Sequence, residues 1–182
     1  MQIDAFKYFS QVTNEFGWPN FERCRFQPID AHALSASREA RKSEQLLANH
    51  FKEACKSELE KARAIYVWIC HNITYDVDAV FSGKSSNTKS EDVLVRGSAI
   101  CGGYARLFES LSNKMGLQCK VISGYSKGNS LNERVPTSPN HAWNAVRIDD
   151  KWTICEKFHK SEMSWKLQNI KVNDGYFVFK NK

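Results

Sequence analysis

The chain has 182 residues, of which 42% are hydrophobic and 12% aromatic, and its formal net charge is +6. This composition predicts one globular domain with a single hydrophobic core and excludes a disordered chain. The basic residues are scattered and form no block of five or more Lys or Arg, so nucleic-acid binding is not indicated.

The beginning of the chain carries no clear helix or strand. It is rich in aromatic residues and is interrupted by Gly and Pro. We expect an N-terminal arm or flank over residues 1–28, followed by one domain over residues 29–182. His32 is expected in a loop.

Two helices are predicted next. The first runs from about Ser37 to Phe51, where helix-forming residues predominate, with Leu46, Leu47 and His50 or Phe51 as its apolar stripe. The second has a clear start signal, because Ser57 and Glu60 are spaced as in a capping box. Its expected buried residues are Ala64, Ile65, Trp68 and Ile69.

The second helix is expected to end near Asn72. A short extended segment over residues 73–76 follows it, and then a polar surface loop over residues 82–92.

Cys101 lies where a loop passes into a helix. It is followed by Gly102 and Gly103, and then by apolar residues at helical spacing that begin with Tyr104 and Leu107. The N–H groups and the positive dipole end of a helix N-terminus stabilise a thiolate and lower the pKa of a cysteine. A buried structural cysteine beside a turn is the alternative, and this segment alone does not decide between them.

Two strands are predicted around Asp149 and Asp150, after an earlier strand from Cys119 to Tyr125 and a long loop. A last strand is expected at residues 175–179. If the two aspartates form the turn, Ala145 lies opposite Ile154. His141 and Glu156 are then diagonal neighbours on one face of the hairpin, with Cβ atoms at most roughly 7–8 Å apart. A turn of odd length would place Glu156 on the opposite face.

This hairpin makes Cys101 a candidate nucleophile. A nucleophilic cysteine needs a general base, and the base needs a partner that fixes its tautomer; His141 and Glu156 supply both. The order Cys101, His141, Glu156, with the helix first and the hairpin after it, is that of papain-like architecture. A structural strand histidine is the alternative for His141, and His159 is its one rival as the base.

The six cysteines include no C-x-x-C pair, which argues against a zinc ribbon or a thioredoxin-like site. No run of 18 apolar residues and no signal-like start is present, so we expect a cytoplasmic protein with free thiols and no membrane insertion. No calcium-loop pattern occurs either, and neither a metal nor a cofactor is expected.

From about Ile29 to Glu156 the chain resembles the transglutaminase-like superfamily, and within it the branch of kyphoscoliosis peptidase. The likeness is carried by six ordered blocks: IDAHAL (29–34), KARAIYVWI (61–69), NITYD (72–76), CGGYA (101–105), SGYSKG (123–128) and HAWNAV (141–146). The resemblance implies an α+β class and a papain-like, transglutaminase-core fold, in which N-terminal helices and the nucleophile-bearing helix pack on an antiparallel sheet.

By this resemblance Cys101 matches the nucleophile and His141 the base, while Glu156 stands where the family pattern has aspartate. The implied function is that of a cysteine peptidase or acyltransferase acting on protein amide bonds through a thioester. The alternative is a weakly active or inactive module that binds cytoskeletal or other protein partners. Removal of N-linked glycans is a third function, which no sugar-binding aromatic pattern favours.

The thioester chemistry needs two donors to the oxyanion of the tetrahedral intermediate. The Cys101 N–H at the helix start is the expected first donor. The second is left open among Trp68, Trp143 and Tyr104, each of which is also a core candidate.

Overall fold

The computed structural model describes residues 23–82, 89–124, 139–156 and 166–169. The helices are α2 (Arg23–Leu34), the 3-10 helix η1 (Ala40–Lys42), α3 (Glu44–Ala54), α4 (Glu58–Asn72), α5 (Val77–Phe81), α6 (Ser90–Arg96) and α7 (Cys101–Lys114). The strands are β1 (Thr74–Tyr75), β2 (Ser98–Ala99), β3 (Cys119–Gly124), β4 (His141–Ile148), β5 (Lys151–Glu156) and β6 (Lys166–Asn169).

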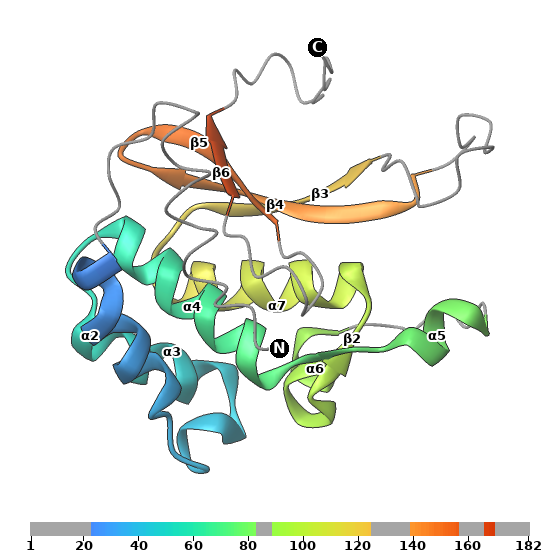
Figure 1. Ribbon diagram of the computed structural model, residues 1–182, viewed down its shortest axis with the longest axis horizontal. Helices are drawn as coiled ribbons and strands as arrows, with labels where there is room; N and C mark the ends of the chain where they lie inside the picture. The colour runs from blue at the N-terminus through green and yellow to red at the C-terminus, as the bar shows by residue number, and fades with distance from the viewer. Residues whose placement is uncertain (1–22, 83–88, 125–138, 157–165, 170–182) are drawn as a thin grey trace, which may run out of the picture.

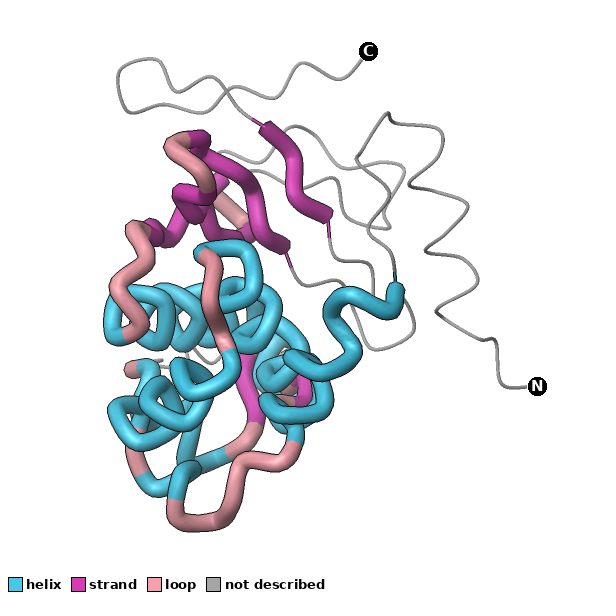
Figure 2. Tube along the Cα trace, turned by 90° about the vertical axis from the view of Figure 1, so that its left-hand side faces the viewer, coloured by secondary structure: helices cyan, strands magenta, loops and turns pink. Residues whose placement is uncertain are grey.

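The helices form one layer and an antiparallel sheet of order β3-β4-β5-β6 forms the other (Figures 1 and 2). The core lies between them, where Leu107 and Leu111 of α7 and Val146 of β4 are fully buried. The predicted α+β class is therefore confirmed, with α7 packed on the sheet. Within the described part of the chain, we find no helix whose length and apolar character would let it span a bilayer.

Helix α2 lies where the sequence predicts no element. It contains Pro28 and places His32 in a helix, so the expectation of a loop at His32 is wrong. Contacts with α4 compensate for the proline: Ala33 is fully buried, and Arg63 donates two hydrogen bonds to Asp30, with N–O distances of 2.8 and 2.6 Å. The predicted boundary between an arm and a domain stays a prediction, since residues 1–22 lie outside the described residues.

Helix α3 begins later than the predicted helix. Ser43 has an extended backbone (φ −149°, ψ 154°), and its side chain accepts the N–H of Leu46, so the chain starts a new helix there rather than continuing from Ser37. Leu47 and Phe51 are fully buried as expected, but Leu46 is 46% exposed and does not belong to the buried stripe.

Helix α4 is confirmed in its start, its buried face and its end. The Ser57 hydroxyl accepts the N–H of Glu60 at 3.2 Å, and the Glu60 carboxylate accepts the N–H of Ser57 at 3.0 Å, which completes the capping box. All four residues predicted to be buried are at most 3% exposed.

We expect Ser57→Ala to lower the free energy of unfolding by about 1 kcal/mol. The variant leaves the N–H of Glu60 without its acceptor at the helix start. Urea denaturation followed by circular dichroism measures the change. Ser82→Ala is the matched control, because the Ser82 hydroxyl is exposed and makes a long contact of 3.4 Å, and its effect should stay within about 0.5 kcal/mol. Equal effects of the two variants would contradict the capping role.

The polar segment 82–92 is only in part a loop. Residues 83–88 lie outside the described residues, but α6 begins at Ser90, so the expectation of a loop up to Asp92 is wrong. Glu91 and Asp92 lie in the first turn of α6, where negative side chains stabilise the helix through its dipole. Val93 is fully buried and packs the helix against the core.

The predicted hairpin is present, with β4 and β5 joined by the two aspartates. Asp149 and Asp150 have φ values of 49° and 63°, as in a two-residue type I′ turn. Ala145 pairs with Ile154, which is the register that this turn predicts. Strand β6 was not predicted, and the last strand expected from the sequence, at residues 175–179, lies outside the described residues.

Candidate active site

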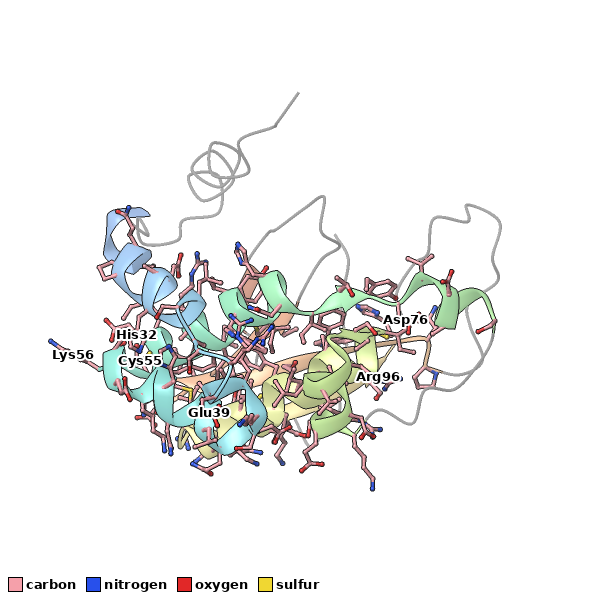
Figure 3. All side chains as sticks on the ribbon, turned by 90° about the horizontal axis from the view of Figure 1, so that it is seen from below. His32, Glu39, Cys55, Lys56, Asp76 and Arg96 are labelled. Atoms are coloured by element: carbon pink, nitrogen blue, oxygen red, sulfur yellow. The ribbon has the colours of Figure 1, made fainter. Side chains whose placement is uncertain are left out.

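Cys101 is the first residue of α7, and only the N-cap residue Ile100 separates it from the short strand β2. Strand β1 pairs in parallel with β2, and the N–H of Asp76 donates to the Ala99 carbonyl at 3.0 Å (Asp76 is labelled in Figure 3). The strand pair therefore fixes the chain that enters the helix. The half-buried thiol lies at the positive end of a 14-residue helix, as the sequence predicts.

The Cys101 thiol contacts the His141 side chain, although the two residues are 40 positions apart in the sequence. This hydrogen bond is the main cause of a lowered Cys101 pKa. Burial acts in the opposite direction, while the N–H groups of Ala142 and Gly102 and the nearby His141 charge lower the pKa further. By contrast, burial raises the pKa of Cys55 to about 11 and that of Cys119 to about 12. The environment of Cys101 thus favours its nucleophilic thiolate form.

His141 begins β4 and pairs with Gly124 of β3. Its ring packs against the Trp143 indole, with 5.7 Å between the ring centroids and an interplanar angle of 34°. The indole lies directly over Gly124: a Cβ at this glycine would be 2.5 Å from Cη2 of Trp143. Because glycine has no side chain, the indole can lie there and support one side of the imidazole.

Glu156 ends β5, next to Cys155, which pairs with Asn144. The turn has two residues, so the register condition under which Glu156 and His141 share a face is met. The Glu156 side chain and the rival His159 lie outside the described residues. The structure therefore brings Cys101 and His141 together. The role of Glu156 as the partner of His141 stays a prediction.

Two of the three aromatic residues considered as oxyanion donors are engaged elsewhere or buried in the core. The Tyr104 hydroxyl donates to the Ile73 carbonyl at 2.7 Å, and Trp68 is 2% exposed inside the core. The structure also places the N–H groups of Ala142 and Gly102 at the Cys101 sulfur, and the sequence did not indicate the first of them.

Tyr75 is a further aromatic residue of the site that sequence reasoning missed. Its ring stacks on Tyr104, one helical turn after Cys101, with 6.2 Å between centroids and an interplanar angle of 10°. Tyr75 is 36% exposed, and its pKa is raised by burial and by the nearby Cys101. The sequence did offer one signal for Tyr75, since it lies in the NITYD block (72–76) that carries the family resemblance. Its place at the site depends on the parallel pairing of β1 with β2, which the sequence does not predict.

Among the described residues, His32, His50 and Glu53 could offer three metal ligands within 4.8 Å of one another. Each imidazole Nε2, however, already contacts the backbone carbonyl of the other histidine, at 2.7 and 2.8 Å. The rings are stacked 4.2 Å apart and nearly parallel, so their nitrogen lone pairs lie in separate planes and cannot converge on one ion. We interpret the pair as a contact that fastens α2 to α3 (His32 is labelled in Figure 3).

Comparison with known proteins gives consistent results. The family model described as "Transglutaminase-like superfamily" matches residues 45–156, a range that contains Cys101, His141 and Glu156. Kyphoscoliosis peptidase of Mus musculus is 35% identical over 156 residues, covering 85% of this chain and 22% of that protein. The Homo sapiens protein of the same name is 34% identical over 134 residues, covering 72% and 20%. The chain thus spans about a fifth of the length of these relatives.

The fold is also similar to that of a solved structure, a candidate cysteine protease from Cytophaga hutchinsonii. The TM-score is 0.50 at 23% sequence identity, and the match covers 76% of this chain and 44% of that chain. The fold is therefore of the cysteine-protease and acyltransferase type, which confirms the predicted papain-like, transglutaminase-core architecture.

Proposed function

Because the chain belongs to the transglutaminase-like superfamily, in the branch of kyphoscoliosis peptidase, we propose that it is a cysteine-dependent hydrolase or acyltransferase acting on protein amide bonds. The observation that carries the proposal is the hydrogen bond between the Cys101 thiol and the His141 side chain, together with the lowered pKa of that thiol. An imidazole held at a thiol at a helix N-terminus is the arrangement that activates a cysteine nucleophile.

In the proposed reaction the Cys101 thiolate attacks the carbonyl carbon of an amide, and the carbonyl π electrons move onto oxygen. His141, as the imidazolium, donates its proton to the leaving nitrogen as the C–N bond breaks, which gives a thioester and a free amine. His141 then accepts a proton from water or from a second amine, which attacks the thioester. The product leaves and the Cys101 thiolate is restored. Glu156 is proposed to hold the His141 tautomer from the adjacent strand.

The alternative is a module that keeps this fold and binds a cytoskeletal or other protein partner without catalysis. It is favoured by Glu156, which stands where the family pattern has aspartate and is one methylene longer. The two functions differ in one measurable property, which is the reactivity of Cys101.

We expect Cys101 to react with iodoacetamide at lower pH than the other measurable thiols. Only the thiolate reacts, so a lowered pKa moves the curve of rate against pH to lower pH, and a raised pKa moves it to higher pH. Quantitative peptide mass spectrometry over a pH series gives the curve of each cysteine. Cys55 is the internal control, since it is also half-buried but has a pKa raised to about 11. If the Cys101 and Cys55 curves coincide, the enzyme proposal fails and the binding module remains.

A further inference from the structure

Asn144 links the helix that carries the nucleophile to the strand that carries the base. It lies within β4, is 4% exposed, and donates from Nδ2 to the Ala105 carbonyl of α7 at 2.9 Å. The same nitrogen lies 3.6 Å from Sγ of Cys119 on β3. A buried amide costs free energy unless it is hydrogen-bonded, and this one donates to the facing helix as well as to the neighbouring strand of the sheet.

The position of this contact relates it to the candidate site. Ala105 lies four residues after Cys101, about 6 Å along α7. Asn144 lies three residues after His141, about 10 Å along β4. The contact therefore ties helix to strand close to the place where Cys101 and His141 meet. Strand β4 lies over α7 (Figure 1).

Near this contact α7 and β4 also meet through apolar residues: Leu107, Leu111 and Val146 belong to one buried core cluster. Apolar contacts are non-directional. A hydrogen bond, by contrast, requires a narrow range of distance and angle, so it constrains the position of the helix along the strand more sharply. The position of the Cys101 sulfur relative to the His141 ring thus depends on the Asn144 amide more than on the surrounding leucines.

We propose that Asn144 is a positioning residue, whose amide sets the register of α7 against β4 so that His141 meets Cys101. This inference rests on the proposed function of the pair and adds a residue that acts through it. A structural role alone would make Asn144 a contributor to stability without effect on the thiol.

The test is the pH curve of Cys101 alkylation in Asn144→Leu, which is similar in size but has no amide. We expect alkylation at neutral pH to slow roughly 3- to 10-fold, and the midpoint to move to higher pH, because the loss of one hydrogen bond lets the pair drift apart. Thr153→Val is the matched control: Thr153 is also buried and polar, but its hydroxyl contacts the Lys151 carbonyl on its own strand rather than α7. Its curve should be that of the wild type even where its stability falls.

A double-variant cycle separates positioning from stability. If Asn144 acts through His141, Asn144→Leu adds no further slowing in a His141→Ala background, whereas independent effects would multiply. An Asn144→Leu curve equal to that of the wild type overturns the positioning role alone. Equal curves for wild type and His141→Ala overturn the proposed function as well. If the leucine variant does not fold, Asn144→Ser, which is too short to span the contact with Ala105, takes its place in the same cycle.

Discussion

Replacing His141 by Ala is expected to abolish the selective reactivity of Cys101 and any amide hydrolysis that depends on it. The His141 hydrogen bond is the main cause of the lowered Cys101 pKa, and the burial that opposes it would remain after the substitution. The pKa should then rise, so that little thiolate is present at neutral pH. We expect the alkylation rate of Cys101 at neutral pH to fall at least 10-fold, and hydrolysis to fall roughly 100-fold or more, the usual contribution of a general acid–base group.

The measurement is the iodoacetamide rate at Cys101, read by peptide mass spectrometry, with a fluorogenic peptide amide for hydrolysis. His50→Ala is the control for loss of a histidine, because the His50 ring stacks on His32 between α3 and α2. It should lower stability and leave the Cys101 rate unchanged after correction for the folded fraction. A His141→Ala protein whose Cys101 reacts as fast as in the wild type would refute the activated pair.

The sequence predicted the elements whose signals are local. Helix α4 is set by its capping box, in which Ser57 and Glu60 satisfy each other's backbone N–H groups, and by apolar residues at helical spacing. The β4–β5 hairpin is set by the turn at Asp149 and Asp150, residues that tolerate positive φ better than most. Because this turn fixes the register, the prediction that Ala145 faces Ile154 needed no tertiary information.

The features that the sequence did not predict depend on contacts between distant segments. Helix α2 contains a proline and is stabilised by Arg63, which is 33 residues away from its partner Asp30. Tyr75 joins the site only because β1 pairs with β2. Strands of two residues are too short to show an alternation of apolar and polar residues, so the sequence does not predict their pairing. The candidate nucleophile Cys101 and base His141 could be named because a cysteine followed by a histidine in this order is typical of cysteine nucleophiles with a histidine base. The Ala142 N–H at the sulfur could not, since every residue but proline has such a group.

Replacing Gly124 by Ala is expected to disturb the candidate site from the opposite strand. The new methyl group would lie 2.5 Å from Cη2 of Trp143 and 3.3 Å from two further ring carbons. Trp143 is 6% exposed and its indole is rigid, so relief requires the whole ring to move, away from its packing against His141. We expect the free energy of unfolding to fall by about 1–3 kcal/mol, as for other overpacked sites. The Cys101 alkylation rate should fall with it, since the imidazole loses the surface that holds it.

Two comparisons separate crowding from the general cost of replacing a glycine. Gly116→Ala introduces the same methyl group at φ +81°, where nothing lies within 4 Å, so it strains the backbone and should lower stability without changing the pH curve of Cys101. Trp143→Phe in the Gly124→Ala background shortens the ring that meets the new methyl group, and we expect part of the Cys101 reactivity to return. If Gly124→Ala and Gly116→Ala leave the Cys101 curve equally unchanged, the indole does not position His141, and its packing over Gly124 serves stability alone.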